Sequence, residues 1–339
     1  MKICHIIPSN AYCSPVLLAL KIAESTASDK DESIVYYLKE ASGKSIESKT
    51  IVLKKFDLSD FLDLRHFDII HSHLLRADII NAICACMTNA TTISTIHSNI
   101  KEDLRTYIKN NYLTYIISKI WFISLNKLTH RVAVSKSLAE SYKSTLKSCE
   151  FIPNGIDNEI VENSNSRKQK EQRFSVGFLS RLHPGKGIED AFELAKKSTE
   201  VDVYVYGDGV LSELCEQYNE KYDNFHYKGY SSNITKSFQS FDIFIMPSRH
   251  EGFGMTVLES LVHQVPVICY DIPVFREILG NGDYFYNTVD ELYEKINAYK
   301  NNYTDILAQQ NDRLHYFDEK IMIERYSALY NLKKKKYIK

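Results

Sequence analysis

The stretch between residues 241 and 280 constrains the fold of this 339-residue chain more than any other. It reads FDIFIMPSRHEGFGMTVLESLVHQVPVICYDIPVFREILG. The short apolar runs Phe241–Met246 and Val265–Cys269 are typical of buried strands. Between them, the apolar residues of 255–263 recur at helical spacing. The stretch therefore predicts a strand–loop–helix–strand unit.

Two glutamates lie at the ends of the middle piece of this unit, Glu251 in the loop and Glu259 in the helix. Eight residues of helix rise by about 12 Å, which is close to the span from the sugar ring to the ribose of an extended nucleotide sugar. Between the glutamates, free N–H groups at the helix N-terminus would attract a phosphate. Two solvated glutamates are the alternative, but the helix around Glu259 is otherwise strongly apolar.

The sequence PSRHEGFGMTVLESL resembles the donor-site signature of the retaining family-4 glycosyltransferases, also called glycosyl transferases group 1. In that family the first glutamate meets the transferred sugar and the second meets the ribose. The resemblance implies these roles for Glu251 and Glu259. It also places the residues between them in the expected donor site, namely Gly252, Phe253, Gly254 and Met255.

A basic turn, SRLHPGKG, follows another predicted strand at residues 180–187. The guanidinium of Arg181 could grip two phosphate oxygens, and the ammonium of Lys186 would add a point charge. An ordinary surface turn is the alternative, but the matching family position favours binding of the donor diphosphate. The G-D-G turn that begins at Gly207 resembles the family's turn beside the base-binding pocket.

Three histidines lie at or near the ends of predicted strands: His71 and His73 in DIIHSH, and His97 after Thr91–Ile96. Open α/β sheets bind ligands along that edge. No carboxylate or paired spacing accompanies these histidines, so we do not expect a metal site. His97 matches the family's strand-end histidine, which implies a hydrogen bond to a sugar hydroxyl. A satisfied, partly buried histidine remains the alternative, and His73 is expected to be structural or to line the cleft.

The alternation of strands and helices predicts parallel sheets covered on both faces. The resemblance implies the α/β fold named GT-B, in which two Rossmann-like domains face a central cleft and a C-terminal helix returns to the first domain. We expect an acceptor-binding domain at 1–156, a linker at 157–173, a nucleotide-sugar-binding domain at 174–315 and the returning helix with a basic tail at 316–339. The family's first loop usually carries two glycines, whereas SNAYC here has none.

Composition limits the remaining classes of protein. A net charge of −1 gives no general attraction to nucleic acid, and we expect no such partner. The seven cysteines are scattered, which is typical of reduced thiols in a cytosolic protein. The first residues, MKICHIIPSNAY, predict a strand rather than a signal peptide, and no apolar run reaches the length of a membrane span.

These features predict a retaining glycosyltransferase that moves a hexose or N-acetylhexosamine from a nucleotide-diphosphate sugar to a glycan. A UDP-sugar is the favoured donor, and a lipid-linked acceptor in O-antigen, capsule or lipopolysaccharide biosynthesis is expected from the family. Neither a cofactor nor a metal is expected, because basic side chains would stabilise the leaving diphosphate and the chain has no D-x-D motif. The expected catalytic residues are Glu251, His97, Arg181 and Lys186. A sugar-nucleotide epimerase and a non-catalytic binding subunit are the alternatives.

One further segment, residues 105–131, is rich in aromatic and aliphatic residues and contains four lysines and arginines before its last position. Its composition is typical of a helix that lies in a membrane interface. Together with Lys333–Lys336, this segment predicts a cytoplasmic protein that attaches to the anionic inner face of the plasma membrane. A helix packed on the sheet of the first domain is the alternative.

Overall fold

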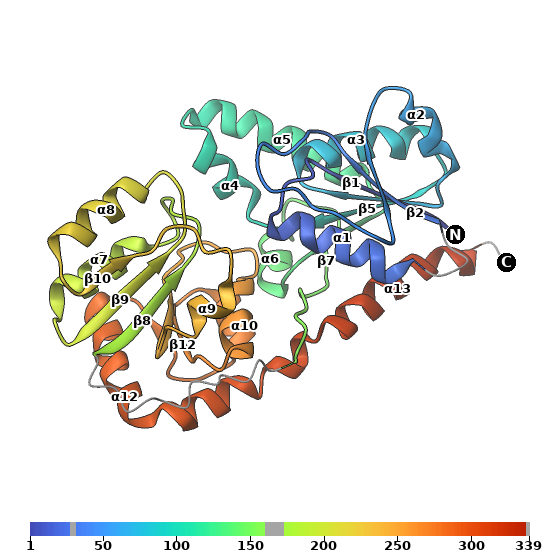
Figure 1. Ribbon diagram of the computed structural model, residues 1–339. Helices are drawn as coiled ribbons and strands as arrows, with labels where there is room; N and C mark the ends of the chain where they lie inside the picture. Colours follow the sequence, from blue (N-terminus) through green and yellow to red (C-terminus); the bar gives the residue numbers. More distant parts are fainter. Residues whose placement is uncertain (28–31, 160–172, 337–339) are drawn as a thin grey trace. The chain divides into compact units, whose positions relative to one another are not determined.

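The computed structural model describes residues 1–27, 32–159 and 173–336. The chain divides into two compact units, one formed by Met1–Gly155 with Glu319–Lys339 and the other by Ile156–Asp318. Each unit contains one β-sheet with helices packed on it (Figure 1). Residues 160–172, which make up most of the predicted linker, lie outside the described residues. The assignment of acceptor and donor binding to different domains stays a prediction.

The sheet of the first unit has the strand order β3-β2-β1-β4-β5-β6-β7, and all its pairs are parallel. The order reverses direction between β1 and β4, as in doubly wound nucleotide-binding folds. The strands are β1 Lys2–Ile7, β2 Glu32–Tyr37, β3 Val52–Lys55, β4 Ile69–His73, β5 Thr91–Ile96, β6 His130–Ala133 and β7 Glu150–Phe151.

Helices cover both faces of this sheet. Ile7 packs with α1, whereas Cys4 and Ile6 on the opposite face pack with α3, as the twofold alternation of a strand requires. The helical segments are α1 Ser14–Thr26, α2 Asp60–Asp63, η1 Leu64–His66, α3 Leu75–Met87, α4 Ile100–Tyr107, α5 Asn111–Lys127, α6 Lys136–Ser141 and α13 Glu319–Lys336.

The last helix, α13, belongs to the first unit although it follows the second unit in sequence (Figure 1). Its side chains Met322, Tyr326, Leu329 and Tyr330 are buried in one cluster with residues of four strands, namely Ile3 of β1, Ile69 of β4, Ile93 of β5 and Val132 of β6. The predicted return of a C-terminal helix is therefore confirmed. The helix continues into the predicted basic tail as far as Lys336, because this lysine-rich end contains no glycine or proline that would stop it.

The sheet of the second unit has the order β10-β9-β8-β11-β12-β13, again with parallel pairs only. The strands are β8 Phe174–Leu179, β9 Val201–Tyr206, β10 Phe225–Tyr227, β11 Ile243–Met246, β12 Val267–Tyr270 and β13 Phe285–Tyr286. The strands predicted at 241–246 and 265–269 each start two residues later than expected. In both cases a turn, at residues 239–240 and 263–264, ends shortly before the strand, and Phe241 and Val265 are buried between the turn and the strand.

The helical segments of the second unit are α7 Ile188–Lys197, α8 Ser212–Lys221, α9 Ile234–Phe238, α10 Met255–Val262, α11 Pro273–Leu279, α12 Val289–Asn311 and η2 Leu314–Phe317. The central strand–loop–helix–strand prediction is thus confirmed as β11, α10 and β12. Helix α12 is interrupted at Asn302, where φ is −123°.

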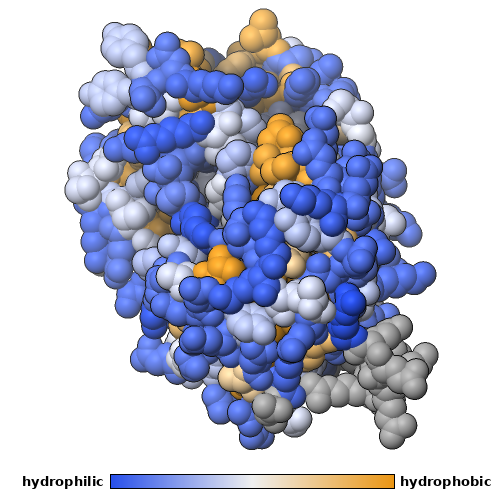
Figure 2. Space-filling view, turned by 90° about the vertical axis from the view of Figure 1, so that its left-hand side faces the viewer, coloured by the Kyte–Doolittle hydropathy of each residue, from blue (hydrophilic) through white to orange (hydrophobic). Residues whose placement is uncertain are grey.

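The face of the molecule in Figure 2 is largely hydrophilic, and its hydrophobic residues form small separate groups. Among the described residues, no helix is both long enough and apolar enough to cross a bilayer.

The segment at 105–131 forms two helices rather than one, because α4 ends at Tyr107 and Asn110 caps α5 with hydrogen bonds to two backbone N–H groups. The prediction that its aromatic residues reach a membrane is wrong for Trp121. This side chain is 4% exposed, and its Nε1 donates to Asp78 Oδ2 at 2.6 Å. One face of α5 therefore packs on the first unit.

Candidate functional site

Most of the predicted donor residues lie on two loops, which leave the neighbouring central strands β8 and β11 of the second unit. The strand order reverses between this pair, so the following loops diverge and leave room at the carboxyl edge of the sheet. Ligands of open α/β sheets bind at this position. The loops cover residues 180–187 and 247–254.

Backbone contacts hold the two loops together. The N–H of Arg249 donates to the carbonyl of Gly185 at 2.9 Å. Gly187 has φ of +73°, and a Cβ at this position would lie 2.1 Å from the carbonyl oxygen of Pro247. Only glycine permits this approach. The position of Lys186 relative to the second loop is therefore fixed by its two glycine neighbours.

Lys186 Nζ forms an ion pair with Glu251 Oε1 across these loops. The side chains are 17% and 13% exposed, so water screens the pair only partly. The structure thus brings together two residues that the sequence assigned to different parts of the donor. Their assigned roles stay predictions, but their proximity makes a single polar site of the two loops.

Two further predicted donor residues, Arg181 and Gly207, lie on the loops that follow β8 and β9. Arg181 is exposed at the start of its loop. Gly207 has φ of +146°, and a Cβ there would lie 1.9 Å from the carbonyl oxygen of Ser180, so the two loops pack directly on each other. Its N–H donates to Gly229 at 2.8 Å, and its carbonyl accepts from the hydroxyl of Tyr227 at 3.1 Å.

The turn before α10 is anchored by burial. Gly252 is buried, and the ring of Phe253 packs edge-on against Phe317 with 5.7 Å between ring centroids. Gly254 is the N-cap with φ of +100°, and a Cβ there would approach Phe275 to 2.8 Å. Met255 then starts the helix. Because Gly254 has no side chain, no side-chain cap competes with an anion for the first N–H groups of the helix.

Glu259 is partly buried on α10, and desolvation raises the pKa of its carboxyl to about 7. A ribose diol would be a suitable polar partner for this half-buried carboxylate, because its hydroxyls would donate hydrogen bonds to it. Without such a partner, its ionisation in the folded state is costly.

We expect Glu259→Gln to stabilise the protein above pH 7 and to leave its stability unchanged below pH 4. The folded pKa is raised above that of the unfolded chain, so the folded state binds more protons between about pH 4.5 and 7, and stability falls across that window. The glutamine removes a penalty on the order of 2 kcal/mol at pH 8. Thermal melts at pH 4 and pH 8 measure this. Equal melting shifts at both pH values would contradict the assignment.

Arg249 has a role that the sequence did not reveal. Its guanidinium donates to both carboxylate oxygens of Asp190, at 2.8 and 2.9 Å, and to the carbonyl of Pro247 at 2.7 Å. It also stacks on Tyr270, with its carbon 3.7 Å from the ring centroid. The hydroxyl of Tyr286 donates to Asp190 at 2.6 Å. This Arg249 cluster connects the 247–254 loop to α7, β12 and β13.

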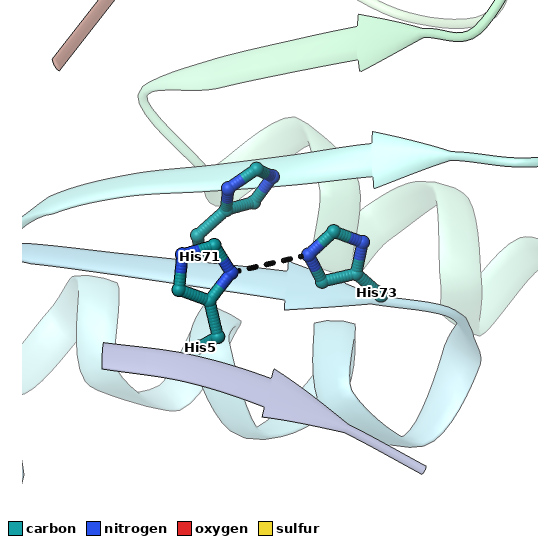
Figure 3. Close-up of side chains that lie close together, drawn as sticks. All are labelled: His5, His71 and His73. Carbon is teal, nitrogen blue, oxygen red and sulfur yellow. Dashed lines mark hydrogen bonds between the residues drawn. The ribbon is translucent and has the colours of Figure 1, made fainter. Parts of the chain in front are cut away.

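The histidines lie in the first unit and form a buried group. His71 and His73 are fully buried, and His73 Nδ1 lies 3.0 Å from Nε2 of the partly buried His97. Sequence reasoning did not consider His5, which opposes His71 in the register of β1 and β4. Figure 3 shows the rings of His5, His71 and His73 gathered on one side of these strands.

Nitrogens of His5, His71 and His73 lie within 4.8 Å of one another, so the three could hold a metal ion by distance alone. However, both nitrogens of His71 already lie at hydrogen-bond distance from hydroxyls, at 2.7 Å from Tyr330 and 2.8 Å from Thr95. His5 and His73 contact each other at 3.4 Å (Figure 3). The ring nitrogens of these three histidines therefore fit a hydrogen-bonded group better than a metal centre.

The first loop compensates for its missing glycines with backbone pairing. Tyr12 N–H donates to Lys44 at 2.9 Å, and Ile46 N–H donates to Asn10 at 2.8 Å. Ala11 and Ser45 form an isolated antiparallel bridge. The loop is therefore held by the segment between β2 and β3.

Comparison with known proteins identifies relatives of both halves. Residues 159–316 match the family model of glycosyl transferases group 1, and residues 37–160 match that of glycosyltransferase family 4. The O-antigen biosynthesis glycosyltransferase WclY of Escherichia coli is 30% identical over 300 residues, which is 82% of this chain and 82% of that protein. A poly(ribitol-phosphate) alpha-N-acetylglucosaminyltransferase of Staphylococcus aureus is 28% identical over 163 residues, which covers 44% of this chain and 33% of that enzyme.

Solved structures show the same fold. HepE of Anabaena, in complex with UDP and glucose, superimposes with a TM-score of 0.81 at 16% identity and covers 97% of this chain and 99% of its own. The apo form of the lipopolysaccharide outer core galactosyltransferase WaaB has a TM-score of 0.72 at 15% identity and covers 98% of this chain and 100% of its own. The predicted α/β fold of GT-B type, with two Rossmann-like domains, is confirmed.

Proposed function

Because the chain belongs to the glycosyl transferases of group 1 and is a glycosyltransferase, we propose that it moves a hexose or N-acetylhexosamine from a nucleotide-diphosphate sugar to a glycan with retention of configuration. A UDP-sugar is the proposed donor, since the fold neighbour HepE was solved with UDP and glucose. The proposed pathway is the biosynthesis of an O-antigen or related surface polysaccharide, because the relative WclY acts in O-antigen biosynthesis.

The observation that carries this proposal is the ion pair of Lys186 and Glu251 between the loops of β8 and β11. The pair lies where the strand order reverses, beside the N-terminus of α10. The cation of Lys186 fits the phosphate end of a sugar–phosphate bond, and the carboxylate of Glu251 fits the sugar end. Lys186 would exchange Glu251 for a donor phosphate oxygen, and Glu251 would then accept hydrogen bonds from the sugar. Both groups are already desolvated in part, so the exchange costs little reorganisation.

Charge development then explains catalysis. Cleavage of the sugar–phosphate bond places negative charge on the leaving diphosphate. Lys186, Arg181 and the N-terminus of α10 would stabilise that charge more strongly in the transition state than in the bound donor. Retention would follow if the acceptor hydroxyl attacks the sugar from the same face that the diphosphate leaves. This route needs no protein nucleophile, because an oxygen of the leaving phosphate helps to deprotonate the acceptor hydroxyl. His97 would hydrogen-bond to a hydroxyl of the transferred sugar.

A donor screen tests the proposal. UDP-, GDP- and ADP-sugars are added to the purified chain, and the melting temperature is followed, because a ligand that binds only the folded state raises it. A shift with one nucleotide sugar, followed by acceptor-dependent release of the nucleotide, supports the transferase. Conversion of the sugar nucleotide without acceptor would indicate an epimerase, and binding without turnover would indicate a non-catalytic subunit.

We expect transfer to persist in excess EDTA. The positive charges at the diphosphate are supplied by Arg181 and Lys186, so a divalent cation is not required for charge stabilisation. The measurement is the initial rate after dialysis against EDTA, with and without added magnesium or manganese. Complete loss of activity that either metal restores would contradict the proposed phosphate site.

We further propose that the protein acts in the cytoplasm at an anionic membrane surface, where a lipid-linked acceptor would be presented. The outer face of α5 carries large exposed side chains, whereas small polar residues such as Thr114, Ser118 and Ser124 face inward. Basic residues flank this face. The exposed set comprises Tyr112, Leu113, Tyr115, Ile120 and Ile123 with Lys109, Lys119 and Lys127, and Ile83 and Met87 of α3 are exposed as well. Such a face fits the boundary between acyl chains and headgroups.

Vesicle co-sedimentation should show binding that depends on anionic lipid and on this face. We expect replacement of Lys109, Lys119 and Lys127 by Glu to abolish binding, because each lysine contributes about 1 kcal/mol near such a surface. A control replaces the exposed Val52, Leu58 and Leu62 of the same unit by Ser and should bind normally. Equal, negligible binding to neutral and anionic vesicles would refute the attachment. The side chains of Lys333–Lys336 lie outside the described residues and stay a predicted contribution.

A further inference from the structure

A continuous line of hydrogen-bonding side chains runs through the first unit from α13 to His97. Alternation along the strands places these groups on the face that packs against α13, beside Ile3, Ile69 and Ile93. Two hydroxyls of α13 complete the line. In order, its members are His97, His73, His5, Tyr330, His71, Thr95 and Tyr326.

The contact distances vary along this line. His97 Nε2 lies 3.0 Å from His73 Nδ1, and His73 Nε2 lies 3.4 Å from His5 Nδ1 (Figure 3). His5 Nε2 lies 3.4 Å from Tyr330 Oη, which is 2.7 Å from His71 Nδ1. Each histidine in the middle of the line therefore uses both ring nitrogens.

Burial favours the neutral form of all four imidazoles. Burial lowers the pKa of His5 and of His97 to about 3 and holds the pKa of His71 and of His73 well below the usual value. A neutral imidazole carries one proton, so one nitrogen donates and the other accepts. A histidine with partners on both sides must then receive a hydrogen bond on one side and give one on the other.

The shortest contact sets the direction. Tyr330 has one hydroxyl proton and two histidine neighbours, and its contact with His71 Nδ1 at 2.7 Å is much shorter than its contact with His5 Nε2 at 3.4 Å. Tyr330 therefore donates to His71 Nδ1, and its oxygen accepts from His5 Nε2. Because each ring has one proton, His73 donates from Nε2 to His5, and His97 donates from Nε2 to His73.

We infer that Tyr330, His5 and His73 are positioning residues that hold the proton of His97 on Nε2 and leave its Nδ1 as a bare acceptor at the strand edge. The inference rests on the proposed function for its purpose, since it deepens the role of His97 there. A bare Nδ1 accepts a hydrogen bond from a hydroxyl, so the group that His97 recognises is a sugar hydroxyl acting as donor. The returning helix thereby supplies the hydroxyl that orders the site.

The test is the ¹⁵N spectrum of the histidine side chains of the full chain, with His97 assigned by comparison with His97→Gln. We expect a protonated Nε2 and a bare Nδ1 in the unchanged protein. In Tyr330→Phe, His5 loses its acceptor and His71 its donor, so His97 should show both tautomers. The control is Tyr326→Phe, which removes an equally buried hydroxyl of the same helix from the far end of the line and should leave His97 unchanged.

Activity gives a second readout. We expect Tyr330→Phe to lower kcat on the order of 10-fold, as loss of an orienting partner does at other sites, with little change in KM for the donor. A His97 protonated on Nδ1 in the unchanged protein would overturn the inference, even if Tyr330→Phe fails to fold. An unaltered His97 tautomer in folded Tyr330→Phe would overturn it as well. Addition of zinc gives a further check, since loss of the ring N–H protons of His5 and His73 on zinc binding would also overturn the inference.

The proposed function and the positioning role of Tyr330 are refuted by different results. Absence of sugar transfer by the unchanged protein would refute the proposed function, but the tautomer of His97 is measured without any substrate. Normal transfer with an unaltered tautomer in Tyr330→Phe would refute only the positioning role.

Discussion

Replacement of Glu251 by alanine should nearly abolish sugar transfer, with a rate loss of roughly 10²–10³-fold or more, and leave the fold intact. Glu251 lies in contact with Lys186 in a partly desolvated site at the carboxyl edge of the sheet. Lys186→Ala should lower kcat more than it weakens donor binding, because charge grows on the diphosphate in the transition state. Initial rates and calorimetric donor titrations separate the two effects.

A matched control for these variants is the ion pair of Lys197 and Asp290 in the same unit, whose side chains are 37% and 77% exposed. Lys197→Ala should leave kcat and donor affinity unchanged, since exposed pairs contribute little. Near-normal turnover of purified Glu251→Ala or Lys186→Ala would show that the catalytic site lies elsewhere.

Asp190→Ala should destabilise the second unit by roughly 3 kcal/mol. The substitution leaves the Arg249 guanidinium without its two carboxylate contacts and deprives the Tyr286 hydroxyl of its acceptor. Because Arg249 also holds the 247–254 loop through Pro247, donor affinity should fall as well. Hydrogen exchange measured by mass spectrometry reports the opening of the second unit separately from the first.

Asp271 and Arg276 provide the control for this prediction. They form the same two-bond pair at 2.6 Å, with the guanidinium carbon 4.5 Å from the Phe285 ring centroid, but Arg276 is 47% exposed. Asp271→Ala should therefore cost less than about 1 kcal/mol. If both aspartate variants were equally stable, burial would not explain the importance of the Arg249 cluster.

The elements of the fold that could be predicted were those with a local signal. Thr91–Ile96 is a strand over its full predicted range, because it is an alternating run bounded by loop residues. Lys186 and Glu251 were identified from short motifs, since glycine and charge at fixed spacing are visible along the chain. Their direct contact was not visible, because it depends on how two loops meet.

Long-range partners account for what sequence reasoning missed. The segment at 105–131 was assigned to a membrane interface from composition alone, but its Trp121 is buried and donates a hydrogen bond to Asp78, 43 residues away. Tyr330 was expected only as part of the returning helix, whereas its hydroxyl contacts His71, 259 residues away. The recurrence of histidine in β1 and β4 on one strand face was the available signal for this group.

The most direct test of the account is the reaction of the purified chain with the donor that raises its melting temperature and a lipid-linked glycan acceptor. NMR of the product gives the anomeric configuration of the new linkage. We predict nucleotide release that requires the acceptor and a product linkage with the same anomeric configuration as the donor. An inverted linkage, or conversion of the nucleotide sugar without acceptor, would contradict the proposed retaining transfer.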